Sequence, residues 1–292
     1  MREQDGYLIG LVGAGIGPSL SPPLHEREAD ALGLRYRYCR WDLDVLARPA
    51  ESVGELLVAA RSAGYDGLNI THPCKQLVVE HLDDLSPDAV ALGAVNTVVF
   101  AGSRAIGHNT DWSGFARSFS RGLPDVSVDR VVLLGAGGAG AAVAHALLTL
   151  GTRVLRVLDA DHERAEALAS SLRGRFGADR AEAVRPNLLA KSVAWADGLA
   201  HATPTGMAAH PGLPVPAELL RPGLWVADVV YRPLETELVA AARAAGCRVL
   251  DGGGMAVFQA VESFRLFTGV EPDADRMLHH FAELAGGVRA RR

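Results

Sequence analysis

Short apolar segments alternate with amphipathic segments along most of the chain. Four segments of the first half are rich in β-branched, aromatic and other apolar side chains, as expected of buried strands: residues 7–12, 36–41, 67–70 and 95–100. Between them, residues 23–32 are polar and compatible with a helix, and a helical pattern covers residues 49–63 and 77–82. Strands that alternate with helices predict a wound, mainly parallel α/β sheet.

A second cycle of the same kind begins at residue 131. Its strands are predicted at residues 131–134, 154–158, near 199, 225–229 and 248–250, and its first helices at 139–150 and 164–172. Between the cycles, residues 111–129 turn polar and include Gly122 and Pro124, which marks a domain boundary. Because 292 residues exceed one comfortable hydrophobic core, we expect an α/β protein of two domains.

Composition narrows the class of protein. Lys and Arg number 29 against 34 Asp and Glu, and no positive run could follow a phosphate backbone, so nucleic-acid binding is not expected. The sequence shows no signal peptide and no apolar run long enough to cross a bilayer, so no membrane partner is expected. Cys39, Cys74 and Cys247 fit neither a disulfide framework nor a zinc site. These features predict a cytoplasmic protein without a bound metal.

A glycine motif follows the first strand of the second cycle. Gly135-Ala136-Gly137-Gly138-Ala139-Gly140 has the form G-x-G-x-x-G, directly after an apolar strand and directly before a helix. There the glycines permit a tight turn, a close approach to a pyrophosphate and close packing of helix on strand. The motif predicts a dinucleotide-binding Rossmann domain, with a packing turn as the alternative. The earlier Gly13-Ala14-Gly15-Ile16-Gly17 has the wrong spacing and leads into Pro18, so we reject it as a nucleotide site.

Asp159 ends the second strand of this cycle, about 20 residues beyond the glycines. A carboxylate there can accept hydrogen bonds from both hydroxyls of the adenosine ribose and would repel a 2′-phosphate. The sequence therefore favours NAD over NADP. Two points stay open: Asp159 could cap the next helix, and Arg164 lies near enough to bind a phosphate.

Lys75 is one of two lysines in a chain whose positive charge is otherwise arginine. It follows Asn69-Ile70-Thr71-His72-Pro73-Cys74, at the end of a predicted strand and beyond a proline turn. A lysine can be tuned to exchange a proton near neutral pH, whereas an arginine cannot. A solvated lysine at a helix start is the alternative. His72 and Cys74 lack the third orienting group of a nucleophilic site, so we reject that chemistry.

Other blocks accompany this one in a fixed order. They are Ser19-Leu20-Ser21-Pro22, Gly93-Ala94-Val95-Asn96-Thr97, Gly107-His108-Asn109-Thr110-Asp111, Thr203-Pro204-Thr205-Gly206-Met207, Asp228-Val229-Val230-Tyr231 and Met255-Ala256-Val257-Phe258-Gln259-Ala260. Together with the glycine motif they resemble the shikimate dehydrogenase family over nearly the whole chain. The sequence Thr71-His72-Pro73-Cys74-Lys75 is most similar to the quinate/shikimate dehydrogenase branch.

The resemblance implies a role for each block. Lys75 and Asp111 would be the acid/base pair on a hydroxylated cyclohexene or cyclohexane carboxylate. The substrate carboxylate would be held by Ser19, Ser21 and Tyr231, and the ring hydroxyls by Thr71, Asn96 and Gln259. Besides the glycine motif and Asp159, the cofactor side would include Arg164, Thr203, Met207, Val229, Gly253 and Met255. The C-terminal helices, from about residue 255 to 292, would join residues 1–111 as the substrate domain and leave 112–254 as the NAD domain.

Departures from the family pattern keep alternatives open. His201 stands where the family usually has asparagine, and the phosphate clamp Asn-Arg-Ser/Thr that many members carry after the second strand is missing. The sequence does not decide between shikimate and quinate as the preferred substrate, or between a monomer and a homodimer. A specialised aminoshikimate-type dehydrogenase is one alternative function. A catalytically silent dinucleotide sensor is a further alternative, although Lys75 and Asp111 are both present. A folate-linked dehydrogenase with the same two-domain layout is not supported by the Ser19/Ser21 block or by the Asn109-Thr110-Asp111 block.

Overall fold

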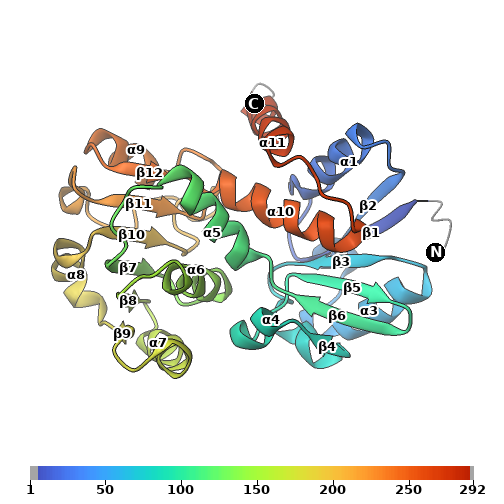
Figure 1. Cartoon of the computed structure of the whole chain (residues 1–292), viewed down its shortest axis with the longest axis horizontal. Helices are drawn as coiled ribbons and strands as arrows, with labels where there is room; N and C mark the ends of the chain where they lie inside the picture. The colour runs from blue at the N-terminus through green and yellow to red at the C-terminus, as the bar shows by residue number, and fades with distance from the viewer. Residues whose placement is uncertain (1–5, 290–292) are drawn as a thin grey trace. The chain divides into compact units, whose positions relative to one another are not determined.

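The computed structural model describes residues 6–289 and divides into two compact units (Figure 1). The first unit comprises Met1–Thr110 and Val257–Arg292, and the second Asp111–Ala256. Each unit contains one six-stranded sheet with helices packed against it. The predicted two-domain α/β fold class is confirmed. One helix, α10 (Gly253–Thr268), begins in the second unit and continues into the first.

The first unit combines six strands with helices from both ends of the chain. Its strands are β1 (Tyr7–Gly13), β2 (Tyr36–Asp42), β3 (Gly67–Ile70), β4 (Asp84–Leu85), β5 (Thr97–Ala101) and β6 (Arg104–His108). Its helices, besides most of α10, are α1 (Ser21–Ala31), α2 (Leu43–Leu46), α3 (Val53–Ser62), α4 (Pro87–Leu92) and α11 (Ala274–Arg289), with 3₁₀ turns at Ala50–Ser52 and Leu77–His81.

The sheet of this unit has the order β2-β1-β3-β5-β6-β4. Strand β1 is parallel to β2 and β3, whereas β5 is antiparallel to both of its neighbours, β3 and β6. The sequence predicts the strand at residues 95–100 but not its hairpin partner β6, in which only Ala105 and Gly107 are buried. The "mainly parallel" sheet is therefore mixed on this side.

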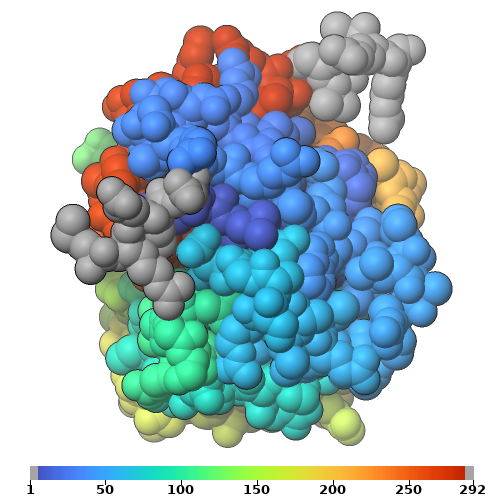
Figure 2. All heavy atoms as spheres, turned by 90° about the vertical axis from the view of Figure 1, so that its right-hand side faces the viewer, coloured from blue at the N-terminus to red at the C-terminus, as the bar shows by residue number. Residues whose placement is uncertain are grey.

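Helix α11 is joined to α1 by an ion pair with one buried member. The carboxylate of Glu28 on α1 is fully buried, and Arg276 on α11 donates to both of its oxygens, from Nε at 2.8 Å and from Nη2 at 2.6 Å. The backbone N–H of Asp273 donates to the same carboxylate at 2.7 Å. Figure 2 shows the red C-terminal residues beside blue residues of the N-terminal half.

The second unit contains the second cycle of strands and helices. Its strands are β7 (Arg130–Leu134), β8 (Val154–Leu158), β9 (Ala181–Ala183), β10 (Gly198–His201), β11 (Trp225–Asp228) and β12 (Arg248–Leu250). Its helices are α5 (Asp111–Gly122), α6 (Gly138–Thr149), α7 (His162–Phe176), α8 (Leu189–Trp195) and α9 (Glu237–Ala244), with 3₁₀ turns at Pro186–Leu188 and Ala217–Leu219.

All neighbouring strands of this second sheet are parallel, in the order β12-β11-β10-β7-β8-β9. Read from β9, this is the 3-2-1-4-5-6 order of dinucleotide-binding folds, whose ligands lie outside the carboxyl ends of the strands where the order reverses. Here the reversal lies between β7 and β10. The fold predicted from the glycine motif is therefore present.

Helix α5 occupies most of the polar segment that the sequence marks as a boundary. Phe115 and Phe119 lie four positions apart, so both rings face the same side of the helix and are buried in the core of the second unit. The ring of Phe119 meets that of Trp225 edge-on, with 4.9 Å between ring centroids. The segment is polar by composition because the apolar side of this amphipathic helix is narrow.

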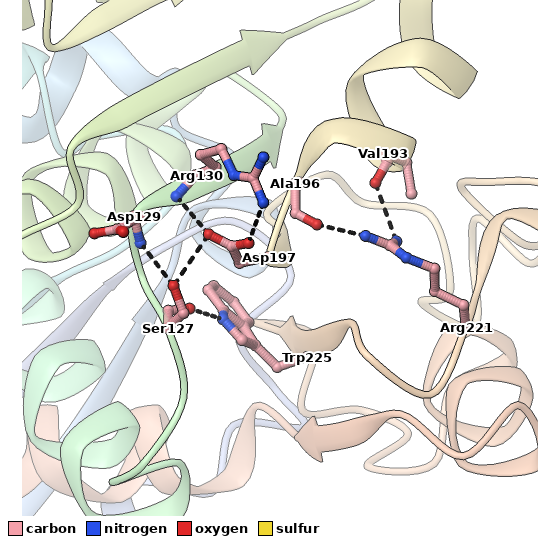
Figure 3. Close-up of polar contacts among 8 residues, drawn as sticks. All are labelled: Ser127, Asp129, Arg130, Val193, Ala196, Asp197, Arg221 and Trp225. Carbon is pink, nitrogen blue, oxygen red and sulfur yellow. Dashed lines mark hydrogen bonds and ion pairs between the residues drawn. The ribbon is translucent and has the colours of Figure 1, made fainter.

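The amino ends of β7, β10 and β11 are fixed by a polar cluster around Asp197 (Figure 3). One carboxylate oxygen of Asp197 accepts from the Arg130 backbone at 3.0 Å and from the Ser127 hydroxyl at 3.1 Å, and the other accepts from the Arg130 guanidinium at 2.8 Å. Burial acts to raise the pKa of Asp197, but the hydrogen bonds from Arg130 and Ser127 outweigh it and the pKa is lowered. This cluster lies at the amino ends of these strands, whereas the glycine motif lies at the carboxyl end of β7.

Arg221 closes the end of α8 in the same region. Its guanidinium donates to the carbonyl oxygens of Val193 at 3.1 Å and Ala196 at 2.6 Å, at the carboxyl end of this helix (Figure 3). Within residues 6–289, no helix is both long and apolar enough to span a bilayer.

Candidate active site

Most of the predicted substrate residues lie at one edge of the first sheet. The carboxyl ends of β1 and β3 share this edge because the two strands are parallel, and antiparallel β5 begins there while β6 ends there. Segments that follow β1, β3 and β6 therefore converge with the segment that precedes β5. These are the segments that carry Ser19 and Ser21, Thr71 and Lys75, Asn96, and Thr110.

Lys75 lies on a turn that is fixed at several backbone positions. Thr71 N–H donates to the Val12 carbonyl at 2.9 Å, and Cys74 N–H donates to the Thr71 carbonyl at 2.9 Å. The His72–Pro73 peptide bond is cis. Val95 N–H donates to the carbonyl of Lys75 at 2.8 Å, and the Lys75 side chain is partly exposed. The turn thus holds Lys75 beside the segment that leads through Asn96 into β5.

Asn96 is the centre of a buried side-chain network. Its Nδ2 donates to the Thr110 hydroxyl at 2.9 Å and to Gln259 Oε1 at 3.3 Å, and its Oδ1 accepts from the Thr110 backbone at 2.8 Å. The Thr110 hydroxyl donates to the Gln259 carbonyl at 3.1 Å. Asp111 follows Thr110 directly and begins α5. Three separate sequence blocks therefore meet within the first unit.

Ser19 and Ser21 follow a glycine turn that a carboxylate closes. Asp42, the last residue of β2, accepts from the N–H groups of Gly15 at 3.0 Å and Gly17 at 3.1 Å. This internal anion occupies the backbone donors of the turn, which agrees with our rejection of the turn as a nucleotide site. The hydroxyl of Ser19 accepts from the Ser21 N–H at 3.3 Å, and both serines are partly exposed. The Ser19 hydroxyl is thus held in the segment between β1 and α1.

The glycine motif of the second unit forms the turn between β7 and α6. Gly135 has a φ of +99°, a conformation that favours glycine, and a side chain on Gly140 would overlap the Gly135 carbonyl. Helix α6 begins after Gly137 with no side-chain cap, so its first N–H groups face the carboxyl edge of the sheet without an internal acceptor from a capping residue. These features fit a dinucleotide pyrophosphate.

Asp159 lies beside this turn. One of its oxygens accepts from Ala136 N–H at 2.7 Å, and the other accepts from Asp161 N–H at 2.9 Å. The cap of α7 is Asp161, which accepts from the N–H groups of Glu163 and Arg164. Arg164 is exposed, with an ion-pair distance of 3.8 Å between Nη2 and an Asp161 oxygen. The carboxylate at the end of β8 therefore contacts the glycine turn and does not cap the helix.

The remaining predicted cofactor residues follow β10, β11 and β12, at the same edge as the glycine motif. Val229 N–H donates to the His201 carbonyl at 3.0 Å, and Gly253 N–H donates to Asp251 at 3.1 Å. Met207 is 43% exposed, and Met255 packs partly against the core of the second unit. Burial raises the pKa of Tyr231, with Arg232 acting against it, so the phenol stays a neutral donor at physiological pH.

Comparisons with known proteins show relatives of this chain over nearly its full length. The profile of the shikimate dehydrogenase substrate-binding domain matches residues 11–98, and that of the shikimate 5′-dehydrogenase C-terminal domain matches residues 252–279. The chain is 67% identical to a shikimate dehydrogenase (NADP(+)) of Streptomyces avermitilis, over 99% of both chains. It is 48% identical to a quinate/shikimate dehydrogenase (NAD(+)) of Corynebacterium efficiens, over 97% of this chain and 100% of that one.

A solved structure is also similar over the whole chain. Quinate dehydrogenase from Corynebacterium glutamicum in complex with NAD has a TM-score of 0.90 and 46% identity, and the match covers 95% of this chain and 99% of that one. The chain belongs to the shikimate dehydrogenase family. It is an oxidoreductase of the shikimate/quinate dehydrogenase type with a nicotinamide dinucleotide as cofactor.

Further observations on this family member concern Cys74, metal binding and Asp42. Cys74 is buried in the core of the first unit and burial raises the pKa of its thiol, with Glu51 adding to the effect, so a nucleophilic thiolate is disfavoured. Among the described residues, His, Cys, Asp and Glu form no cluster able to hold a metal. The sequence analysis missed Asp42, although its place at the end of a second strand matches that of Asp159.

Proposed function

We propose that this shikimate dehydrogenase family member oxidises shikimate, and also quinate, to the 3-dehydro acid with NAD, and catalyses the reverse reaction. The observation that supports this most strongly is the Asn96 network, because it joins the block that ends in Asp111 to Gln259 and directly follows Val95, whose N–H donates to the Lys75 carbonyl. Residues 1–111 with 255–292 would bind the acid, and 112–254 the dinucleotide. The enzyme would act in the cytoplasm as a monomer or homodimer.

In this proposal Lys75 moves the proton. NAD held by the glycine motif would supply the hydride acceptor for the carbon that bears the reacting hydroxyl. The amine of Lys75 takes the hydroxyl proton at Nζ, and in the reverse direction its ammonium returns that proton to the developing alkoxide. Asp111, as its carboxylate partner, would orient the lysine.

Neutral donors would hold the substrate. The hydroxyls of Ser19, Ser21 and Tyr231 would donate to the carboxylate, and Thr71, Asn96 and Gln259 would bind the ring hydroxyls. Because Asn96 and Gln259 already hydrogen-bond each other, their side chains are pre-oriented before substrate binds.

Asp159 would select NAD. Its two oxygens have lone pairs beyond those used by Ala136 and Asp161, so they can also accept from two ribose hydroxyls. Thr203, Met207, Val229, Gly253 and Met255 would form the nicotinamide side, and Arg164 would lie at the adenosine side.

The test is a comparison of kcat/KM for shikimate and quinate, each with NAD and with NADP. We expect turnover of both acids and higher values with NAD. Binding of dinucleotide without turnover would instead identify a sensor, and fast turnover of an amino analogue alone would identify an aminoshikimate-type dehydrogenase. A clear preference for NADP would contradict the role given to Asp159.

The two lysines offer a matched pair of variants. Lys75→Ala should lower kcat by about a hundredfold to ten-thousandfold, the usual contribution of general acid/base catalysis, and leave NAD binding nearly unchanged. Lys191 lies exposed on α8 of the second unit, so Lys191→Ala removes the same charge without effect on turnover. If Lys75→Ala keeps more than half of the wild-type rate at saturating substrate, Lys75 is not the base.

A further inference from the structure

The second unit contains a polar cluster that the proposed chemistry does not use. His201, at the end of β10, and Asp228, at the end of β11, both have fully buried side chains. Nδ1 of His201 lies 2.9 Å from Oδ1 of Asp228, and its Nε2 lies 2.5 Å from the hydroxyl of Thr203. The hydroxyl of Thr236 donates to the other oxygen of Asp228 at 2.7 Å.

The carboxylate partner assigns a direction to one of these hydrogen bonds. The Asp228 carboxylate only accepts, so Nδ1 of His201 donates to it. At the other side of the ring, Nε2 and the Thr203 hydroxyl share a hydrogen bond, and the hydroxyl oxygen also accepts from Thr205 N–H at 3.3 Å. A buried network in which every member has a partner restricts Thr203 to one rotamer.

Thr203 lies where a fixed rotamer matters. A Cβ on Gly135 would lie 3.0 Å from the Thr203 methyl group, so this methyl packs against the first glycine of the dinucleotide turn. Thr203 also begins the segment that leads to Met207. On the other side of the cluster, Asp228 accepts from Val230 N–H at 3.0 Å and so fixes the turn that leads to Tyr231.

We propose that His201 and Asp228 are positioning residues: by holding Thr203, they set the shape of the nicotinamide half of the cofactor site. The proposal rests on the dinucleotide site described above. Hydride transfer requires the donor and acceptor carbons to be held closely in line, and displacements near 1 Å are costly. His201 and Asp228 therefore act by fixing the position of the Thr203 hydroxyl, and they do not transfer a proton to or from the substrate.

The central test compares two substitutions of Thr203 with one control. Thr203→Val keeps the shape but loses the hydroxyl, and Thr203→Ser keeps the hydroxyl but loses the methyl. Thr149→Val removes a hydroxyl whose bond goes to the carbonyl of His145 in its own helix, at 2.8 Å. NADH dissociation constants, kcat, the KM for shikimate and the isotope effect with deuterium at the transferred position are measured for each.

We expect Thr203→Val to weaken NADH binding and to lower kcat, each by about three- to tenfold, the effect of one hydrogen bond. Its isotope effect should rise, because hydride transfer becomes more rate-limiting, while the KM for shikimate stays unchanged. Thr149→Val should stay close to wild type, and Thr203→Ser, which keeps the hydroxyl, should retain more of the NADH affinity and kcat than Thr203→Val. The proposal is overturned if Thr203→Val keeps wild-type NADH binding, kcat and isotope effect, or if Thr203→Ser is equally impaired.

A double-mutant cycle tests whether His201 acts through Thr203. His201→Leu removes both hydrogen bonds of the ring, and in the Thr203→Val background it should weaken NADH binding little further. Fully additive losses would contradict positioning through Thr203. If His201→Leu does not fold, the two Thr203 variants decide. Failure of the wild type to bind NADH would refute the proposed function, which is a separate result.

Discussion

Replacing Asp159 by asparagine is expected to shift the cofactor preference from NAD toward NADP. The asparagine side chain keeps its size and one carbonyl acceptor, so the hydrogen bond from Ala136 N–H, 2.7 Å long with Asp159, can be retained. What it removes is a negative charge at the end of β8, beside the glycine turn. The change therefore tests charge with little change in shape.

The expected magnitude follows from the charges. A phosphate carries about −1.5 to −2 charges. Two unit charges about 5 Å apart repel by roughly 3 kcal/mol at an effective dielectric constant near 20. Asp159 is partly exposed, and solvent screening reduces this to about 2 kcal/mol, or about 30-fold in NADP affinity. Weaker hydrogen bonds to the ribose should lower kcat/KM with NAD by about fivefold.

The assay is kcat/KM for NAD and NADP at saturating shikimate, and the result is their ratio. Asp161→Asn is the control, because it removes the same charge two positions away and asparagine caps a helix as well as aspartate does. The ratio should change by about 100-fold in Asp159→Asn and by less than about threefold in the control. An unchanged ratio in Asp159→Asn, or an equal change in both variants, would refute the reasoning. In that case Arg164 would be the next residue to replace.

Three further predictions concern the first unit. Ser19→Ala and Ser21→Ala should each raise the KM for shikimate and quinate by about tenfold or more, because each loses a charge-assisted hydrogen bond, and should leave the KM for NAD unchanged. If neither variant changes the KM for shikimate or quinate, the two serines do not bind the substrate carboxylate. Asp42→Ala should also raise the KM for shikimate and quinate, because it removes the acceptor for Gly15 and Gly17 N–H in the turn before Ser19. An equal rise in the KM for NAD would contradict this prediction. Glu28→Gln should destabilise the protein by about 3 kcal/mol in thermal or denaturant unfolding. Arg27→Gln, which breaks an exposed ion pair between the same two helices, should cost less than about 1 kcal/mol, and equal losses would be the contrary result.

The parts of the fold that the sequence predicts well are short apolar runs between turn residues. Strands β3, β8 and β12 begin and end where the pattern places them. The three-residue β9 and the two-residue β4 are too short to show a period, and α8 and α9 are short helices in mixed sequence. Their formation depends on packing against a sheet that no local pattern reveals.

The same limit applies to the candidate site. The motifs identify which residues belong together, but not how they meet. The bond between Asn96 and Gln259 joins residues 163 positions apart, and α10 must fold back onto the first unit before it can form. The cluster of His201 and Asp228 also joins two strands, so the unusual histidine is visible in the sequence while its carboxylate partner is not.

The glycine turns of the two units are similar, but their proposed functions differ. In both, an aspartate at the end of the second strand accepts from the backbone of the first glycine turn: Asp42 from Gly15 and Gly17, and Asp159 from Ala136. In the first unit these bonds use both oxygens, and Pro22 and Pro23 remove N–H donors from the start of α1. The donors of this turn are thereby used by an internal carboxylate, and the serines that follow it are the proposed ligands of the substrate carboxylate. In the second unit α6 begins without proline and without a side-chain cap, so its amide groups are available to an anion. The difference between a substrate turn and a dinucleotide turn thus lies in the donors at the helix start more than in the number of glycines.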